Sequence, residues 1–283
     1  MSFLAKVSRL DRRWIYLMIA LSVALPLVWP FSMPVKVSPH VQSVYAALDA
    51  LPRGSTVLCS FEYGPSTMPE VRPMADAVLE LLIQREHKII VMCLWAEGVF
   101  MARDILDDVA DGRHHLEYGK DYINLGYKAG NEVVIKSIAE SFTRTYPVDT
   151  RGQATASYPI MQGIENLANI DFIFSFSAGY PGTVEWVQYA ADPYDKPLST
   201  GCTAVQVTEV VPYVHSGQCR GILGGLSGAA EFEHLLRDKG ILPALGAANT
   251  GMSAQSIAHL VIVLFIVIGN VAFLVERRRQ RKY

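Results

Sequence analysis

Two long uncharged apolar segments, one near each end of the chain, constrain its architecture most strongly. The first, WIYLMIALSVALPLVWPFS, covers residues 14–32, and the second, SIAHLVIVLFIVIGNVAFLV, covers residues 256–275. An α-helix needs about 20 apolar residues to cross roughly 30 Å of hydrocarbon. We therefore expect two transmembrane helices, at residues 14–33 and 256–275. A buried core helix is the alternative for each, but segments apolar on every side are unusual in a globular chain of 283 residues.

A cleaved signal peptide is a second alternative for the first segment. Its apolar stretch is longer than the usual apolar region of a signal peptide. Prolines and bulky side chains also occupy the place where cleavage requires small residues. We interpret the segment as an uncleaved signal anchor, with Pro26 and Pro30 kinking or ending its last turn. The residues that argue against cleavage are Pro26, Trp29, Pro30 and Phe31.

Lys and Arg residues cluster between each apolar segment and the nearer end of the chain. At the other end of each segment, toward the middle of the chain, only Lys36 lies close by. Because cytoplasmic flanks carry the excess of Lys and Arg, we expect residues 1–13 and 276–283 to be cytoplasmic. Residues 34–254 would then form a periplasmic (extracytoplasmic) domain anchored to the cell (inner) membrane. The basic flanking residues are Lys6, Arg9, Arg12, Arg13, Arg277, Arg278, Arg279, Arg281 and Lys282.

Charge and cysteine content exclude some classes of function. The formal net charge is −2, so no nucleic-acid partner is expected. Four cysteines, an even number, permit disulfides in an oxidising compartment. However, Cys59 and Cys93 lie in apolar runs, where cysteine behaves as a small buried apolar residue. Neither they nor Cys202 and Cys219 show the spacing of a zinc site, and we predict neither a metal nor a cofactor.

Between the apolar segments, short β-branched and aromatic runs alternate with segments of helical periodicity. Helical spacing occurs at residues 71–82 and 133–142, and a leading helix is expected at residues 40–51. This alternation predicts right-handed crossovers and an α/β fold with a doubly wound, Rossmann-like parallel sheet. Residues 145–169 fit either a surface loop or the hinge of a bilobed domain, before a second helix beginning near Tyr158. The predicted strands are residues 55–61, 88–95, 121–127, 171–177 and 198–205.

Loops of polar, small and aromatic residues follow each predicted strand. Ligands of an open parallel sheet bind outside the carboxyl ends of its strands, so these loops form the expected binding crevice. Helix capping and the helix dipole offer a purely structural explanation for many of the same residues. The candidate ligand-binding residues are Glu62, Tyr63, Ser66, Glu97, Lys128, Asn131, Tyr180, Thr183, Thr200 and Thr203.

Catalytic motifs are weak in this sequence. His215 precedes Cys219 by four residues, one helical turn, which could pair an imidazole with a thiol. The surrounding context of known cysteine nucleophiles is missing. Glycine-rich nucleotide motifs and the GxSxG motif of hydrolases are also missing. We assign no catalytic residues, and we favour a non-enzymatic role while enzymatic activity stays open.

The segment GQCRGILGGLSGAAEFEHLL, residues 217–236, is unusually rich in small residues. Glycine inside a helix costs about 1 kcal/mol relative to alanine, so the glycines need a structural reason. Close approach to a neighbouring subunit or a ligand is one reason, and a turn between two short helices is another. Asn270, beside Gly269 in the second apolar segment, could support packing with a partner helix. The candidate oligomer or close-packing residues are Gly221, Gly224, Gly225, Gly228 and Asn270.

This glycine-rich segment, together with YINLGYKAGNEVVI and GCTAVQVTEVVPYV, resembles a set of uncharacterised two-span bacterial and archaeal membrane proteins. Their α/β domain lies between the spans. The resemblance implies the architecture above and no activity or site residue. The leading functional hypothesis is therefore a structural or accessory subunit, or scaffold, of a membrane assembly. Its partners would be the lipid bilayer and either further copies of the chain or other membrane subunits. The alternative is a small-molecule binding or hydrolytic domain that uses the strand-end crevice.

Overall fold

The computed structural model describes residues 11–29, 31 and 34–280. The chain divides into two compact units: residues 35–248 form the first, and residues 1–34 with residues 249–283 form the second. Most of the predicted basic N-terminus, the end of the first predicted span and the last three residues of the basic tail lie outside the described residues.

The first unit is an α/β domain built on a six-stranded parallel sheet with the order β3-β2-β1-β4-β5-β6. Every neighbouring pair of strands is parallel. The order reverses between β1 and β4, the switch point of a doubly wound sheet. The strands are β1 (Thr56–Glu62), β2 (Lys88–Cys93), β3 (Tyr122–Tyr127), β4 (Phe172–Ser177), β5 (Leu198–Cys202) and β6 (Ile222–Gly224).

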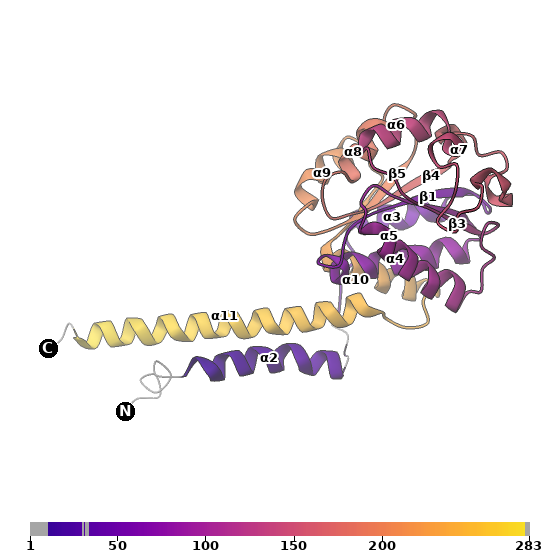
Figure 1. Ribbon diagram of the computed structural model, residues 1–283. Coiled ribbons are helices and arrows are strands. Elements are labelled where there is room, and N and C mark those ends of the chain that lie inside the picture. The colour runs from indigo at the N-terminus through magenta and orange to yellow at the C-terminus, as the bar shows by residue number, and fades with distance from the viewer. Residues whose placement is uncertain (1–10, 30, 32–33, 281–283) are drawn as a thin grey trace. The chain divides into compact units, whose positions relative to one another are not determined.

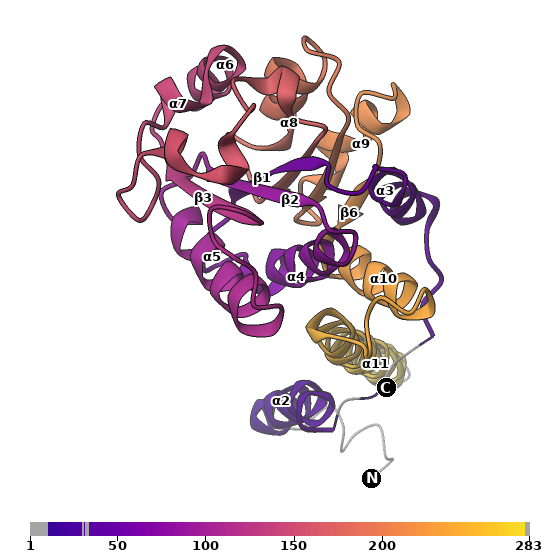
Figure 2. The same cartoon turned by 90° about the vertical axis from the view of Figure 1, so that its right-hand side faces the viewer.

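Helices cover both faces of the sheet (Figures 1 and 2). The crossovers β1–β2 and β2–β3 run over one face, and those from β3 to β6 run over the other. The first layer contains α3 (Pro39–Asp49), α4 (Met68–Gln84), α5 (Gly98–Ile105), the π-helix η1 (Leu106–Arg113) and α10 (Gly225–Asp238). The second contains α6 (Glu132–Glu140), α7 (Phe142–Thr145), α8 (Thr183–Trp186), the π-helix η5 (Val187–Ala191) and α9 (Val207–His215).

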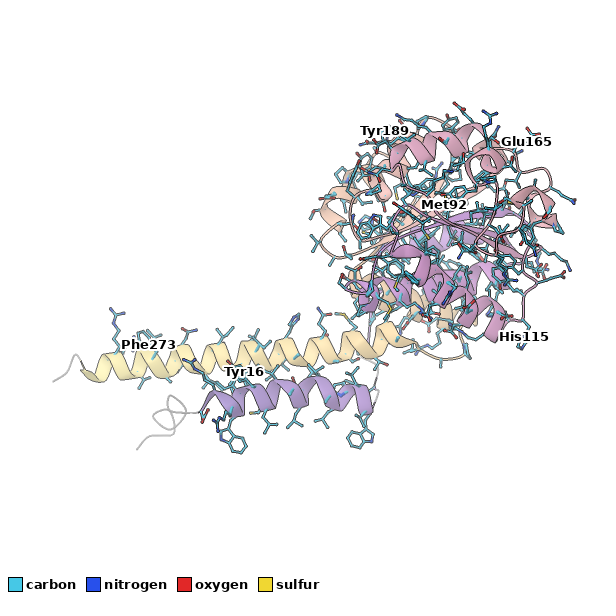
Figure 3. All side chains as sticks on the ribbon, viewed as in Figure 1. Tyr16, Met92, His115, Glu165, Tyr189 and Phe273 are labelled. Atoms are coloured by element: carbon cyan, nitrogen blue, oxygen red, sulfur yellow. The ribbon has the colours of Figure 1, made fainter. Side chains whose placement is uncertain are left out.

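Alternate residues of each strand enter the two halves of the core, as the two-residue period of a strand requires. Toward α4, the rings of Phe61 and Phe176 lie 4.8 Å apart on neighbouring strands. Toward α6 and α8, the apolar cluster includes Leu58, Met92 and Ile173, all fully buried. Figure 3 shows Met92 in the interior of the domain. Burial on both faces explains why the strands read as nearly continuous apolar runs.

Two details of the predicted fold are wrong. A sixth strand, β6, lies inside the glycine-rich segment, where three residues are too short for a periodicity to show. The predicted helix from Tyr158 is absent, because this part of the chain forms three short 3₁₀ turns. Pro159 and backbone bonds to other segments, such as Ile160 N–H to Gly119 O at 2.9 Å, replace helical bonds there. The turns are η2 (Thr155–Ser157), η3 (Pro159–Met161) and η4 (Leu167–Asn169).

The second unit contains the helix α2 (Arg12–Val28) and most of α11 (Ala247–Gln280). Among the described residues, one helix, Ala247–Val275, is long and apolar enough to cross a membrane. Helix α2 has 17 residues, about 26 Å of helix, which is shorter than the roughly 30 Å of a hydrocarbon core. The two-span architecture is therefore a proposal.

Helices α2 and α11 lie side by side within this unit (Figure 1). Many of their large apolar side chains are exposed, Tyr16 and Phe273 among them (labelled in Figure 3). The buried positions carry small side chains, including Ser22 on α2 and Ala254 and Ala258 on α11. Small residues at a four-residue spacing allow apolar helices to approach closely.

Candidate functional site

The switch point between β1 and β4 brings the loops that follow these strands together at one edge of the sheet. Glu62 is the last residue of β1 and pairs in register with Ser177, the last residue of β4. Ser60 pairs with Ser175 two residues earlier, and Ser175 pairs with Thr200 on β5. Because neighbouring parallel strands in register direct these side chains to the same face, a polar patch forms beneath the strand ends.

Glu62 is fully buried at the centre of this patch. Burial raises the pKa of its carboxyl to about 8, while hydrogen bonds from Ser60 and from the Leu94 backbone partly oppose that rise. The Ser60 hydroxyl donates to Oε1, and Leu94 N–H donates to the same oxygen at 3.3 Å. The carboxyl is therefore largely protonated at neutral pH.

A chain of buried hydroxyl groups extends from Glu62 across the sheet. Ser175 Oγ donates to Glu62 Oε2 at 3.5 Å and lies 3.2 Å from Thr183 Oγ1. Thr183 Oγ1 lies 2.7 Å from Thr200 Oγ1, which donates to the backbone oxygen of Ser175 at 2.9 Å. Of the predicted ligand-binding residues, the structure brings Glu62, Thr183 and Thr200 into this one network, which we call the Glu62 cluster together with Ser60 and Ser175.

Two tryptophans lie near the Glu62 cluster, one of them next to Leu94 in the chain. Trp95, after β2, donates its indole N–H to the backbone oxygen of Pro181 at 2.9 Å and packs against Gly179. The loop after β2 is thereby joined to the loop after β4. Trp186, on α8, is fully buried, and its indole N–H makes no hydrogen bond within the described part of the chain. All five side chains of the cluster are buried, so the cluster is sealed from solvent.

Other predicted site residues lie at the surface around this edge. Tyr180 donates its hydroxyl to Glu132 Oε2 at 3.1 Å, which links the loops after β4 and β3. Lys128 reaches the backbone oxygen of Thr145 at 2.7 Å. Asn131 holds a left-handed backbone with φ 49°, a conformation that favours glycine and is often found at functional loops. Ser66 and Glu97 are exposed.

Tyr63 and Thr203 belong neither to the Glu62 cluster nor to the predicted site residues at the surface. Tyr63 is buried beside Phe61 on the opposite face of the sheet, and burial raises the pKa of its hydroxyl. Thr203 is buried, and its backbone N–H bonds Ser177 O at 3.2 Å. Sequence reasoning missed Trp95 and Trp186. It also missed Ser60 and Ser175, although a serine at every second position before a strand end indicates a polar patch on one face.

Exposed apolar side chains lie at or after the carboxyl ends of β2, β3, β4 and β5. Their exposed fractions run from 42% for Tyr127 to 83% for Val205. Large apolar side chains gathered at one edge of a domain indicate an interaction surface. We call this group the strand-end rim, and its members are Phe100, Tyr127, Val133, Tyr180 and Val205.

The candidate catalytic pair is not assembled. Cys219 is buried and donates to the backbone oxygen of Gly221 at 3.2 Å, and burial raises the pKa of its thiol to about 11. The exposed ring of His215 instead stacks on His40, with ring centroids 6.3 Å apart. All four cysteines are free and buried. Among the described residues, no group of His, Cys, Asp and Glu side chains could hold a metal ion.

The glycine-rich segment packs inside its own chain. A Cβ on Gly221 would lie 2.7 Å from the backbone nitrogen of Val44 on α3. One on Gly224 would lie 2.6 Å from the Val207 side chain, and one on Gly228 would lie 2.8 Å from the Leu223 backbone. Gly225 has φ +61°, which glycine adopts without strain. In the second unit, Asn270 is exposed and bonds Ile266 O of its own helix at 2.9 Å.

Comparisons with known proteins add no constraint to this site. No family model, no curated protein and no solved structure matches the chain.

Proposed function

We propose that this protein is a membrane-anchored accessory or scaffold subunit, whose α/β domain docks a second protein through the strand-end rim. The observation that supports this proposal is the exposure of apolar side chains around a sealed polar centre. Tyr180 is 64% exposed and Phe100 is 65% exposed. A site for a small molecule normally offers a concave apolar pocket, whereas protein interfaces are enriched in exposed aromatic residues.

Charges around the strand-end rim favour a different protein over a second copy of this chain. Acidic side chains predominate in the loops that carry the rim, and Lys128 is the basic residue among them. Two rims facing each other would bring like charges together, which costs affinity. A partner with an apolar patch bordered by Lys and Arg complements this surface. The acidic residues are Glu97, Glu132, Glu185 and Glu209.

The membrane placement is part of the same proposal. Helix α11 spans the bilayer, and α2 pairs with it as a second, shorter span. With Lys and Arg on the cytoplasmic side, both chain ends are cytoplasmic and the α/β domain is extracytoplasmic. The test is protease treatment of intact spheroplasts. Cleavage of the α/β domain with protection of both termini is expected, and protection of the domain would contradict the placement.

The docking proposal is tested by native mass spectrometry of the full chain, purified in detergent from its own cells. A complex with a second, different subunit is expected. Val205→Asp and Tyr180→Ser should each remove that subunit, without a change in melting temperature, because both side chains are mostly exposed. His115→Ser, at an exposed position away from the rim (Figure 3), is the matched control. A homo-oligomer, or a complex that survives both rim changes, would overturn the proposal.

A ligand-binding or hydrolytic domain is the second candidate, and the position of Glu62 favours it. Titratable groups with a strongly shifted pKa often mark functional sites, and Glu62 lies beneath the switch point, where ligands of this sheet class bind. Because Glu62 is fully buried, a ligand would require the surrounding loops to move before it could reach the carboxyl. Melting-temperature shifts with sugars, amino acids or nucleotides, abolished by Glu62→Gln, would support this candidate.

A further inference from the structure

A hollow of about 280 Å³ lies beside β3, the strand at one end of the sheet. Its walls come from α5, η1, the first half of β3 and the turn at residues 149–152. None of the residues of the Glu62 cluster or the strand-end rim lines it. Ligand pockets begin at about 300 Å³, so this volume suits a small molecule.

Arg151 is held in a fixed position at the hollow. Its guanidinium carbon lies 3.4 Å from the centroid of the Tyr118 ring, which also lines the hollow. Asp149 anchors both residues, because it accepts from the Tyr118 hydroxyl at 2.7 Å and from Arg151 N–H at 3.0 Å. A guanidinium stacked on a ring keeps its N–H donors at the edge of its own plane. Arg151 is therefore a pre-organised donor with N–H groups left for a ligand.

Asn124, on β3, supplies a second donor from a buried position. Its side chain lines the hollow and is only 4% exposed. The amide oxygen accepts from Gly126 N–H at 2.9 Å, whereas the amide nitrogen makes no hydrogen bond within the described part of the chain. Buried N–H groups normally have a partner. An acceptor oxygen bound in the hollow would provide the missing one.

The charge of the lining favours an anion. Arg103, on α5, and Arg151 contribute two guanidinium groups against the one carboxylate of Asp107, so the lining has a net charge of +1. Neither arginine forms an ion pair in the part of the chain that the structure describes, unlike Arg113, which pairs with several carboxylates. Asp149 does not line the hollow, and its carboxylate already accepts four hydrogen bonds.

The other negative charges near the hollow limit how much anionic charge it can accept. Burial raises the pKa of Tyr122, a lining residue, and Asp111 and Asp107 add to that rise, whereas Arg151 opposes it. A phosphate monoester carries a charge of about −1.5 to −2 at neutral pH, which exceeds the +1 of the lining. A carboxylate carries one negative charge, and its planar oxygens match the fork of an arginine.

We propose that this hollow binds a small organic monocarboxylate. Its carboxylate accepts hydrogen bonds from Arg103, Arg151 and the amide nitrogen of Asn124. Its hydrocarbon part packs on the apolar walls, to which Val99 and Leu106 contribute. The hollow and the strand-end rim share no residue, so this binding is separate from the docking of a second protein.

The first test is calorimetric titration of the full-length protein in a non-ionic detergent, with a titration into protein-free micelles subtracted. Hexanoate, 1-hexanol and hexyl phosphate share the hydrocarbon chain and differ in the headgroup. Hexanoate should bind with one molecule per chain and about tenfold tighter than 1-hexanol, as expected for charge-assisted hydrogen bonds. Equal affinities, or no saturable binding of hexanoate, would overturn the proposal. Tighter binding of hexyl phosphate than of hexanoate would overturn the choice of a carboxylate.

Two arginine variants connect this binding to the hollow. Arg103→Gln and Arg151→Gln should each weaken hexanoate binding about tenfold and leave the affinity for 1-hexanol unchanged. Both side chains are exposed, so the variants should fold. Arg144→Gln is the matched control, because it removes an exposed arginine of the same domain that does not line the hollow. Unchanged hexanoate affinity in both hollow variants, or an equal loss in the control, would overturn the assignment.

Asn124→Asp tests the buried donor. The variant keeps an oxygen to accept the Gly126 N–H and replaces the amide nitrogen by a second oxygen, which cannot donate when ionised. Hexanoate affinity should fall at least about tenfold, measured at pH 8 on protein whose thermal unfolding remains cooperative. Wild-type affinity in this variant would exclude Asn124 from the site. If the variant does not fold, the two arginine variants decide the proposal.

Discussion

Ser175 on β4 donates its hydroxyl hydrogen to the carboxyl of Glu62 on β1, across the switch point of the sheet, at 3.5 Å. Both side chains are fully buried. A buried polar group must find partners inside the protein, and here the partners come from three strands and the start of α8. The pair therefore ties β1 to β4 at the switch point, directly below the loop that carries the rim residue Tyr180.

The stability of the protein should depend on pH through Glu62. Its pKa rises from 4.5 to about 8 on folding because of burial. Between these values the folded state keeps a proton that the unfolded state releases, so the free energy of unfolding falls as pH rises. The slope approaches about 1.4 kcal/mol per pH unit. Glu62→Gln removes this contribution, so urea unfolding of the full chain at pH 5 and pH 8 should show a smaller loss in the variant. Parallel losses in both proteins would contradict the assignment.

Gly228→Ala should destabilise the α/β domain by about 1–3 kcal/mol. Alanine is the better helix former by about 1 kcal/mol, so helix propensity alone predicts a gain. A Cβ at this position in α10 would lie 2.8 Å from the Leu223 backbone, which forces α10 away from β6. Thermal unfolding measures the change. Ser227→Ala, at the exposed neighbouring position, is the control, and a stabilised Gly228→Ala variant would disprove the close contact.

Arg113→Ala should cost about 1–2 kcal/mol of stability. It leaves the Glu80 side chain, which is only 9% exposed, without its guanidinium partner at 2.7 Å. Arg53→Ala breaks an ion pair whose partners are 72% and 65% exposed, and such pairs contribute less than about 1 kcal/mol. Denaturant midpoints of the two variants should differ in this order. Similar midpoints would show that Glu80 finds solvent or another partner.

The four cysteines should resist thiol reagents in the folded protein. Burial raises the pKa of Cys202 to about 12 and that of Cys219 to about 11, so the reactive thiolate is scarce at pH 7.5. Maleimide labelling, followed by mass spectrometry, should proceed only after denaturation. His215→Cys, at an exposed position on α9, provides a rapidly labelled control in the same molecule. Fast labelling of Cys219 in the folded chain would revive the His215–Cys219 pair.

Much of the sheet was predictable, because strands buried on both faces carry a local signal. The runs around Leu58, Met92 and Phe174 are apolar at nearly every position, which distinguishes them from one-sided strands and from loops. β6 was missed because its three residues, Ile222–Gly224, are set by pairing with β5 rather than by their own pattern. The turns after Tyr158 were missed because their backbone bonds run to distant segments such as Gly119.

The candidate site, like the fold, could be predicted from the sequence only in part. Rules for open parallel sheets placed the expected ligand-binding residues after the strands, and the structure joins Glu62, Thr183 and Thr200 in one buried network. It separates Tyr63, which faces α4, from this network. Trp95 and Trp186, which lie near this network, come from a loop and a helix whose positions depend on the whole fold.

Sequence alone was sufficient for properties that depend on the composition and period of short segments: two apolar stretches, basic flanks and an α/β alternation of parallel strands. These signals are local, since hydrocarbon length and strand period act on contiguous residues. Strand order, the burial of Glu62 and the intrachain packing of Gly221 and Gly228 arise from contacts between residues far apart in the chain. Such contacts exist only once the helices and strands have packed, and so only the three-dimensional structure reveals them.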